Sequence, residues 1–441
     1  MRRTSRPSLN GACLVCLLAS APPALRAQTP TEMNARFQAM EERIKALESE
    51  VSTLKAALAA VPEPAAAPQA PPGPAPPQPM QPTSQTGAPA QSSDASARLM
   101  NPAISLIGNL LGAGGHNPVD QRPSLQMVES ELALSAAVDP YARADVYLSF
   151  GEEGVEVEEA YMTFTSLPAG LLLRGGRMRA NFGKVNTLHR HVLPWVDRPL
   201  VNSYLLGGED GIRDAGLSVS RLLPSPGGLF LEAVGQVYRG DSSVIFQQRS
   251  RNDLTAVGHL RAYRDLNEST NLDLGFSFAR GHHGEAELAG PYTIGEAAAP
   301  NVTLLPGDGN FLVSRIYGMD ATLRWKPLRR AIYHSFVGRA EMVWHHRQEP
   351  FGLRKAFGYY ASGEYQLARR WFAGVRVDQS DRLFGPRADD RQQSVLLTYW
   401  PSEFSQIRAQ FRHGSYAGLG SGNELLFQLQ FSIGSHGAHP F

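Results

Sequence analysis

The sequence predicts an all-β transmembrane barrel of about sixteen antiparallel strands, preceded by a short α-helical coiled coil and a proline-rich linker. First, short runs from residue 100 onward alternate apolar and polar residues, which is typical of strands with two different faces. Second, tight turns alternate with long connections along the chain. Third, the chain begins like a secreted protein, and no stretch reaches the ~18 consecutive apolar residues of a membrane helix.

Residues 1–27 are predicted to be a secretory signal peptide. Three arginines among the first six residues precede a short apolar run from about Ala12 to Ala21, and Ala27 fits the cleavage position. The two cysteines of the chain, Cys13 and Cys16, both lie in this segment. The mature protein is therefore expected to contain no disulfide and no reactive thiol.

Residues 28–61 are predicted to form a coiled coil. Thr29-Pro30-Thr31-Glu32 reads as a helix start. Apolar residues then recur at alternating spacings of three and four, at Phe37, Met40, Ile44, Leu47, Val51, Leu54, Leu58 and Val61. Such a seam needs partner helices, so a homo-oligomer is expected, with a trimer favoured although the mixed seam does not separate trimer from dimer. The alternative is an amphipathic helix that packs on its own barrel.

Residues 62–99 are predicted to be a disordered linker rich in proline and alanine. Eleven prolines fall between positions 62 and 93, and charged residues are almost absent there. A segment of this composition cannot bury a core and stays extended. The coil and the part that follows are therefore separate modules.

Residues 100–441 are predicted to form the barrel. In the last strand, Leu425, Phe427, Leu429, Phe431 and Ile433 share one face, and Gln428, Gln430 and Ser432 share the other. The runs 141–150 and 317–326 alternate in the same way. Either a soluble sandwich or a barrel in lipid fits one such strand, so the connections between strands decide.

Seven of the predicted junctions are tight turns, and the junctions between them are longer, including 181–213, 241–255, 281–311 and 381–391. Short turns at one end and long loops at the other are typical of an outer-membrane barrel, which places the protein in the outer membrane of a Gram-negative bacterium. An even number of strands puts both ends of the barrel, and hence the coil, in the periplasm. Trp325, Trp371 and Trp400 lie beside short turns, where an aromatic girdle is expected.

Sixteen strands leave room for an aqueous lumen, and the inward parity carries many charges. The expected ion pairs are Arg143 with Asp145, Asp320 with Arg324 and Lys326, Arg339 with Glu341, and Arg376 with Asp378, while Arg408 and Arg412 are expected to be unpaired. Charges that faced lipid at mid-membrane would cost ~2–4 kcal/mol each, so these residues must face water or one another.

The long segment 181–213 is the third external loop by this count. In trimeric general porins the third loop folds into the lumen and narrows it, so the resemblance implies a pore constriction here. Its charged residues are Lys184, His189, Arg190, His191, Asp197, Arg198, Glu209 and Asp210. Opposed charges of this kind filter small solutes by size and polarity. The alternative is a surface loop that packs on itself.

The segment LRGGRMRANFGKVN, the alternating barrel, the coil and the ending HPF together resemble the phosphate-selective porin O and P type of outer-membrane channel. Phosphate-selective members have lysine-rich lumens, whereas only Lys184, Lys326 and Lys355 follow residue 100 here, so phosphate selectivity is not expected. A last strand that ends in Phe441 also resembles the signal read by the barrel assembly machinery.

These features predict a homo-oligomeric, porin-like channel in outer-membrane lipid that passes small hydrophilic or ionic solutes by passive diffusion. The formal charge of +1 argues against nucleic acid as a partner. No spacing singles out a catalytic triad, so no enzyme activity and no cofactor are predicted.

The alternative function is uptake of a metal such as zinc, or of another ligand, by a receptor without a plug domain. Its candidate ligands are paired histidines, His189 with His191 and His282 with His283 beside Glu285 and Glu287. Further pairs are His345 with His346 and His436 with His439. Titration of the purified protein with zinc tests this alternative.

Overall fold

The computed structural model describes residues 102–434, apart from 152–153, 226, 285, 289–301 and 305–311. The predicted signal peptide, coiled coil and linker, as well as Phe441, lie outside the described residues and stay predictions. Among the described residues, no helix is long and apolar enough to cross a bilayer.

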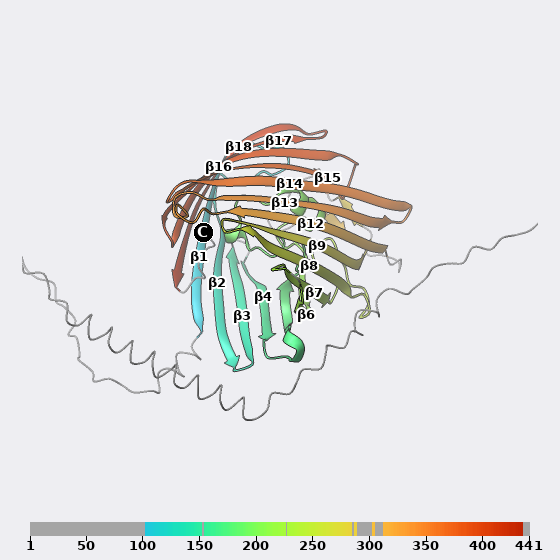
Figure 1. The fold of residues 1–441 in the computed structure, drawn as a ribbon. Coiled ribbons are helices and arrows are strands. Elements are labelled where there is room, and N and C mark those ends of the chain that lie inside the picture. The colour runs from blue at the N-terminus through green and yellow to red at the C-terminus, as the bar shows by residue number, and fades with distance from the viewer. Residues whose placement is uncertain are drawn as a thin grey trace, which may run out of the picture. The chain divides into compact units, whose positions relative to one another are not determined.

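Sixteen antiparallel strands close into a barrel, as predicted (Figure 1). Each strand pairs with its neighbour in the sequence, β9 pairs with β12, and β18 pairs with β1 to close the ring. The strands are β1 (Ala103–His116), β2 (Leu125–Asp139), β3 (Ala142–Gly151), β4 (Gly154–Phe164), β5 (Leu171–Arg179), β6 (Arg213–Leu223), β7 (Phe230–Tyr238), β8 (Thr255–Asn267), β9 (Thr270–His283), β12 (Leu312–Trp325), β13 (Phe336–Glu349), β14 (Gly352–Ala368), β15 (Trp371–Asp381), β16 (Asp389–Ser402), β17 (Ser405–Tyr416) and β18 (Gly420–Gly434). A separate hairpin of β10 (Ala286–Leu288) and β11 (Val302–Leu304) lies in the connection between β9 and β12. One short helix, η1 (Pro168–Gly170), leads into β5.

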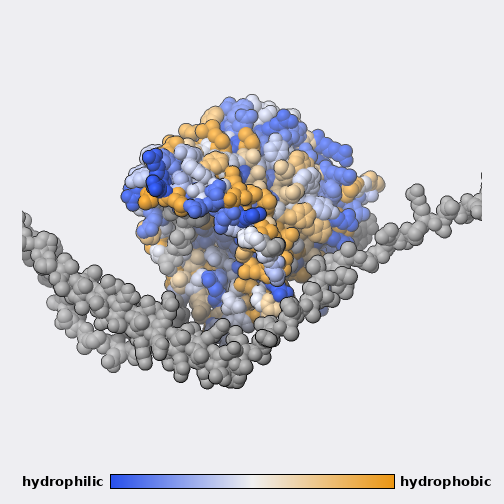
Figure 2. Space-filling view, viewed as in Figure 1, coloured by the Kyte–Doolittle hydropathy of each residue, from blue (hydrophilic) through white to orange (hydrophobic). Residues whose placement is uncertain are grey.

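The alternation of apolar and polar residues in the sequence corresponds to side chains that point alternately out of and into the barrel. In β18, Leu425, Phe427 and Ile433 are exposed, whereas Gln428 and Gln430 between them are buried inside the barrel. Figure 2 shows apolar residues interspersed with polar ones on the visible face. In a closed barrel every strand has two neighbours, so the backbone N–H and C=O groups of the strands are hydrogen-bonded within the wall. A wall with an apolar exterior and a polar interior suits a lipid environment.

The connections also follow the prediction. Tight junctions at one end of the barrel include 140–141 between β2 and β3 and 403–404 between β16 and β17. The longest junctions lie at the other end, at 180–212, 239–254 and 284–311. We call these two ends the short-turn end and the long-loop end.

Two of the three rim tryptophans keep their expected direction. Trp371 follows the outward parity and stacks on Tyr399, with 4.5 Å between ring centroids, and Trp325 follows the outward parity of β12. The prediction for Trp400 is wrong in direction, because Trp400 follows the inward parity of β16 and lines cavities at the short-turn end. A local irregularity of pairing between Tyr399 and Ser402 accompanies this placement.

Candidate functional site

The connection 180–212, which we call the lumen loop, lies inside the barrel. It holds two short helices, η2 (Arg190–Val192) and α3 (Leu200–Leu205). All six residues of α3 are buried, and the helix packs against β13, β14, β15 and β16. The lumen loop is therefore an interior element, as the third-loop prediction expected.

Asn186 closes the neck of the lumen loop. Its side-chain nitrogen donates to the carbonyl oxygens of Ala180 (2.9 Å) and Ile212 (3.1 Å), and its side-chain oxygen accepts from the N–H of Ile212 at 2.8 Å. The N–H of Ala180 also donates to the carbonyl of Ile212. The two ends of the loop are thus held together where it leaves the wall.

A single glycine lets the loop approach β13. Gly183 has a φ of 59°, and a Cβ at this position would overlap the Glu341 carboxylate. That carboxylate accepts from the N–H groups of Lys184 (3.2 Å) and Val185 (3.3 Å) and from the amide of Asn202 (3.3 Å). Glu341 therefore satisfies loop backbone instead of pairing with Arg339, and the predicted Arg339–Glu341 pair is wrong.

Apolar side chains fill the space between the loop and one part of the wall. Phe182, Tyr204 and Leu205 are almost completely buried in one cluster with wall residues such as Ile316 and Tyr360. The hydroxyl of Tyr204 also donates to Asp390 at 2.7 Å. Burial of large apolar side chains stabilises this docking by ~1.5–3 kcal/mol each.

Asp197 is a polar anchor of the lumen loop that contacts three side chains of the wall. Its two carboxylate oxygens each lie 3.0 Å from Nη2 of Arg376 on β15, and one of them lies 2.8 Å from Nη1 of Arg412 on β17. Gln410 donates to the same carboxylate at 2.6 Å. Burial alone would raise the pKa of Asp197, but the two guanidinium groups hold it well below its usual range.

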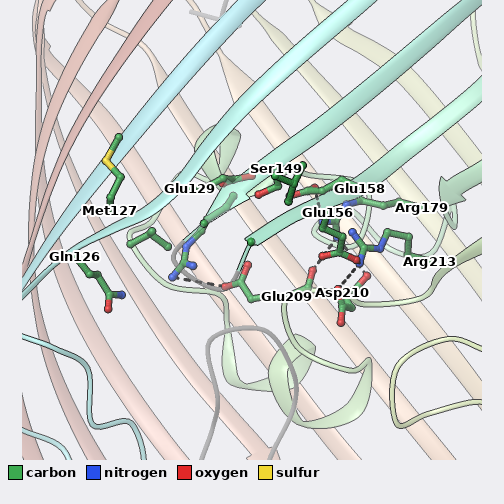
Figure 3. Close-up of a pocket in the computed structure, with 15 residues that line it drawn as sticks. Gln126, Met127, Glu129, Ser149, Glu156, Glu158, Arg179, Glu209, Asp210 and Arg213 are labelled. Atoms are coloured by element: carbon green, nitrogen blue, oxygen red, sulfur yellow. Dashed lines mark hydrogen bonds and ion pairs between the residues drawn. The ribbon is translucent and has the colours of Figure 1, made fainter.

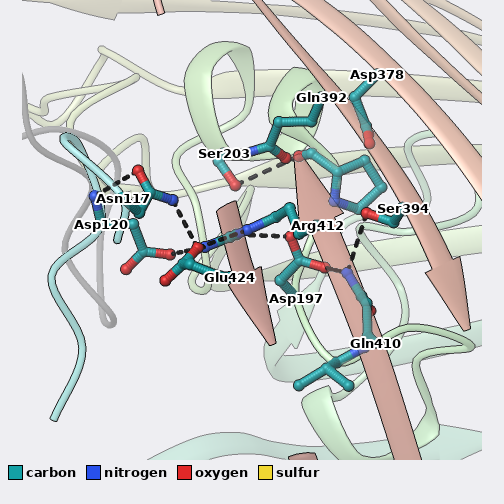
Figure 4. A network of polar contacts seen from close by, with 12 residues as sticks. Asn117, Asp120, Asp197, Ser203, Asp378, Gln392, Ser394, Gln410, Arg412 and Glu424 are labelled. Carbon is teal, nitrogen blue, oxygen red and sulfur yellow. Dashed lines mark hydrogen bonds and ion pairs between the residues drawn. The ribbon is translucent and has the colours of Figure 1, made fainter. Parts of the chain in front are cut away.

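Arg412 links this anchor to a wider polar network (Figure 4). Its guanidinium also contacts Asp120 at 3.1 Å and forms a close ion pair with Glu424 of β18. Asn117 donates to Glu424 at 2.8 Å and so extends the network to the first long-loop junction. The prediction that Arg412 is unpaired is therefore wrong, because its acidic partners come from distant parts of the chain.

The loop reaches the opposite part of the wall through His189. Nδ1 of His189 lies 2.6 Å from Glu131 of β2, and Nε2 lies 2.6 Å from Glu159 of β4. Burial alone would lower the pKa of His189, but the hydrogen bonds with the two carboxylates raise it to about 10. His189 is therefore positively charged and links the loop to the two wall strands β2 and β4.

The remaining predicted lumen charges are only partly paired as expected. The pairs of Arg143 with Asp145 and of Arg376 with Asp378 (2.7 Å) are confirmed. Lys184 lies 2.8 Å from Asp273 and 4.0 Å from Asp320, whereas Arg324 lies 3.9 Å from Asp273. The predicted pairing of Asp320 with Arg324 and Lys326 is thus replaced by a cluster around the loop lysine. Arg408 donates to the carbonyl of Leu193 at 3.0 Å and so also holds the loop.

The other predicted loop charges gather on its long-loop side. Arg198 donates to the carbonyls of Val185 (3.1 Å) and Leu188 (2.7 Å), so its guanidinium stabilises the loop itself. Glu209 lies 3.5 Å from Arg198 and 3.8 Å from Arg190. Burial would raise the pKa of Glu209, but these arginines lower it. Asp210 pairs with Arg213 at the base of β6.

Cavities lie on both faces of the lumen loop. A cavity of about 380 Å³ on the long-loop side is lined by charged residues of both signs, among them Glu129, Glu158, Arg179, Arg190 and Glu209 (Figure 3). A cavity of about 120 Å³ on the short-turn side is lined by His191, Pro194, Arg339, Glu364 and Arg408. The loop thus separates two polar spaces within the barrel.

The two predicted histidine groups have different surroundings. His189 and His191 lie beside four carboxylates, and their ring centroids are 5.8 Å apart. His283 is buried at the end of β9, and its Nδ1 lies 2.7 Å from the carbonyl of Gly284. The side chains of Glu285 and Glu287 lie outside the described residues. His345 contacts the carbonyl of Leu205 at 2.9 Å and so supports the loop.

Several functional residues were missed by sequence reasoning. They are the wall and junction partners of the loop, namely Asp120, Glu129, Glu131, Glu158, Glu159, Asp390, Gln410 and Glu424. Their inward parity is readable in the sequence for most of these strands. A β-bulge at Glu158, however, turns two consecutive glutamates inward, which strict alternation does not predict.

Comparison with known proteins adds the following. No known family profile matches the chain. An uncharacterized protein of Aquifex aeolicus (strain VF5) is 28% identical over 369 residues, which cover 75% of this chain and 73% of that protein. Among solved structures, an anion-selective porin from Comamonas acidovorans has a TM-score of 0.47 at 12% identity and covers 76% of this chain and 100% of its own. The outer membrane channel DcaP of Acinetobacter baumannii has a TM-score of 0.47 at 10% identity and covers 76% of this chain and 96% of its own.

Proposed function

We propose that this chain forms an outer-membrane channel through which small hydrophilic or ionic solutes diffuse passively, and that the lumen loop is its constriction. Two features support the proposal. The exterior of the wall is apolar, which suits lipid, and the interior carries charged side chains of both signs. Polar cavities on both faces of the loop provide space for hydrated solutes.

The observation that carries the proposal is the way the loop is fastened around the ring of strands. Asp197 binds Arg376 on β15 and Arg412 on β17, whereas His189 binds Glu131 on β2 and Glu159 on β4. Lys184 adds a contact to Asp273 on β9. A segment fastened at so many points has a fixed position, so it sets the size and the field of the passage instead of fluctuating across it.

Planar-bilayer recordings of the purified full chain test this function. We expect stepwise, ohmic conductance from the wild-type protein and a larger conductance when loop anchors are removed. Correctly folded protein that gives no conductance, either as wild type or with released loop anchors, contradicts the channel assignment.

We further propose that residues 1–27 direct export, that the coil at 28–61 joins three copies, that residues 62–99 link the coil to the barrel at 100–441, and that the short-turn end faces the periplasm. Phe441 would then serve as the assembly signal.

The seam variant Leu47→Glu should dissociate the oligomer in cross-linking experiments, whereas Ser52→Glu, which lies off the seam, should not. Protease cleavage of the coil on intact cells contradicts the proposed orientation.

A further inference from the structure

Four carboxylates and two histidines meet where the lumen loop touches β2 and β4. We call these residues the carboxylate–histidine cluster: Glu129 and Glu131 of β2, Glu158 and Glu159 of β4, and His189 and His191 of the loop. The pairing of β1 with β2 shifts register at Val128, and the pairing of β3 with β4 shifts at Glu158. Such bulges re-aim side chains and are frequent beside functional sites.

Glu129 is buried beside another carboxylate, that of Glu158. Glu129 is only 4% exposed, and no described donor forms a hydrogen bond with either of its carboxylate oxygens. A buried carboxylate without donors carries a large desolvation cost, and such groups call for an explanation such as a bound ion. Among the drawn residues, Glu129 also lines the cavity of about 380 Å³, which gives an ion a path to it (Figure 3).

The carboxylates of the cluster outnumber the cations that lie against them. His189 lies within 2.6 Å of one carboxylate at each ring nitrogen, so it donates from both nitrogens and carries one positive charge. Arg179 pairs with Glu158 at 3.0 Å. Arg190 lies 3.8 Å from Glu209 and also acts on Glu129, which lies against the carboxylate of Glu158. A divalent cation would take the place of the proton that such a pair of carboxylates otherwise shares.

The spacing of the ligand atoms fits a tetrahedral ion. Ligand atoms of Glu129, Glu131 and His191 all lie within 4.8 Å of one another. Nδ1 of His191 lies 3.4 Å from Oε2 of Glu131. Two ligand atoms that are each ~2.0–2.1 Å from a tetrahedral Zn²⁺ lie ~3.3–3.4 Å apart, which is the same separation.

The surroundings favour a borderline transition metal over calcium or magnesium. An imidazole nitrogen together with two carboxylates is a ligand set typical of Zn²⁺, whereas Ca²⁺ and Mg²⁺ prefer oxygen ligands only. Both ring nitrogens of His189 are engaged by carboxylates, and its Nδ1 contacts Oε2 of Glu131, the same oxygen that lies near His191. Such a hydrogen bond to a ligating carboxylate orients it for the ion.

We propose that Glu129, Glu131 and His191 bind one divalent transition-metal cation of the Zn²⁺ class, which ties the lumen loop to β2. His189 is the positioning residue of this site. His191 lines the cavity on the short-turn side and Glu129 the cavity on the long-loop side, so the ion sits at the boundary between the two spaces. This inference goes beyond the channel function, and it is tested by binding without any bilayer.

The test is isothermal titration of the chelator-treated, detergent-solubilised full chain with ZnCl₂, with CaCl₂ and MgCl₂ as comparison titrants. We expect one tight equivalent of Zn²⁺ and much weaker Ca²⁺ and Mg²⁺ binding. Glu129→Gln and His191→Asn should each weaken this binding at least about tenfold, and His189→Gln should weaken it less. The matched control is His259→Asn, because His259 is a buried lumen histidine that contacts Ser277 and lies outside the cluster.

A second measurement, the visible absorption spectrum of the Co²⁺-loaded wild-type protein, tests the site without any variant and so does not depend on whether a variant folds. Nitrogen and oxygen ligands in tetrahedral geometry should give an intense d–d band, and Zn²⁺ should displace it stoichiometrically. The proposal is overturned if the wild-type protein gives neither tight Zn²⁺ binding nor this band, if folded Glu129→Gln and His191→Asn retain wild-type affinity, or if Ca²⁺ binds as tightly as Zn²⁺.

Discussion

Both carboxylate oxygens of Asp197 lie 3.0 Å from Nη2 of Arg376, although the two residues are 179 positions apart in the chain. Nη1 of Arg376 also donates to the carbonyl of Asp197 at 2.9 Å. The guanidinium thus binds the side chain and the backbone of one loop residue. Since Arg376 stands on β15, this contact fastens the loop directly to the wall.

Asp197→Asn should release the lumen loop. Two buried guanidinium groups, those of Arg376 and Arg412, would lose their shared carboxylate, and breaking a buried pair of this kind costs ~3–5 kcal/mol. The barrel is held by its own ladders, so the loop should undock while the wall stays folded. We expect larger and noisier single-channel conductance. Asp145→Asn is the control, because it breaks an ion pair that does not involve the loop; equal effects of both variants would contradict the anchor.

The same anchor should resist acid. The pKa of Asp197 is lowered in the folded protein, so its stabilising contribution is fully present above the unfolded pKa of ~3.9 and is lost only as pH falls through the lower folded pKa. Because Asp197 stays charged, we expect the loop to remain docked and the conductance of the wild-type protein to change little between pH 7 and pH 4. If the conductance of the wild-type protein rises in this range and that of Asp197→Asn does not, the pKa of Asp197 is not lowered and the prediction is wrong.

Arg190 and Arg198 should differ in what they control. Arg190 lines the cavity on the long-loop side, so Arg190→Gln should shift the reversal potential in a salt gradient toward cation preference. Arg198→Gln should instead loosen the loop, because hydrogen bonds from a charged group contribute ~1.5–3 kcal/mol and two of them go to loop carbonyls. Unchanged reversal potentials in Arg190→Gln would remove Arg190 from the constriction.

Gly183→Ala should weaken the docking of the loop on β13. The positive φ disfavours alanine, and the new Cβ would collide with the Glu341 carboxylate, so a loss above about 1 kcal/mol is expected. Limited proteolysis of the loop measures the effect. Gly258→Ala is the matched control, because a Cβ at Gly258 meets no atom within 4 Å. Equal protection of the loop in both variants would show that Gly183 is not needed for docking.

Neighbouring residues of β6 should respond differently to a charge. Val219 is exposed on the outer face, and Ser220 faces the lumen. In a bilayer, Val219→Lys should destabilise the barrel by up to ~2–4 kcal/mol, depending on its depth, whereas Ser220→Lys should cost much less. Urea unfolding from lipid vesicles measures both, and equal losses would contradict the assignment of the two faces.

The architecture was predictable because its signals are local. Alternation along β18, with Phe427 outside and Gln428 inside, reports the direction of each side chain within a few residues. The order of tight and long junctions gives the number of strands and the two ends of the barrel in the same way. A pair such as Arg376 with Asp378, two residues apart on one face of one strand, is also local, and it is confirmed.

The partners across the lumen depend on closure of the ring and on the path of the loop. Asp197 meets Arg412 across 215 positions, and Glu341 meets loop backbone instead of its strand neighbour Arg339. A bulge at Glu158 and an irregular pairing near Trp400 redirect side chains against the simple alternation. The sequence alone thus determined a barrel with a charged interior and a charged third loop. Only the tertiary structure decided which charges meet, because most buried carboxylates in the filled lumen pair with donors that are near in space but can be distant along the chain.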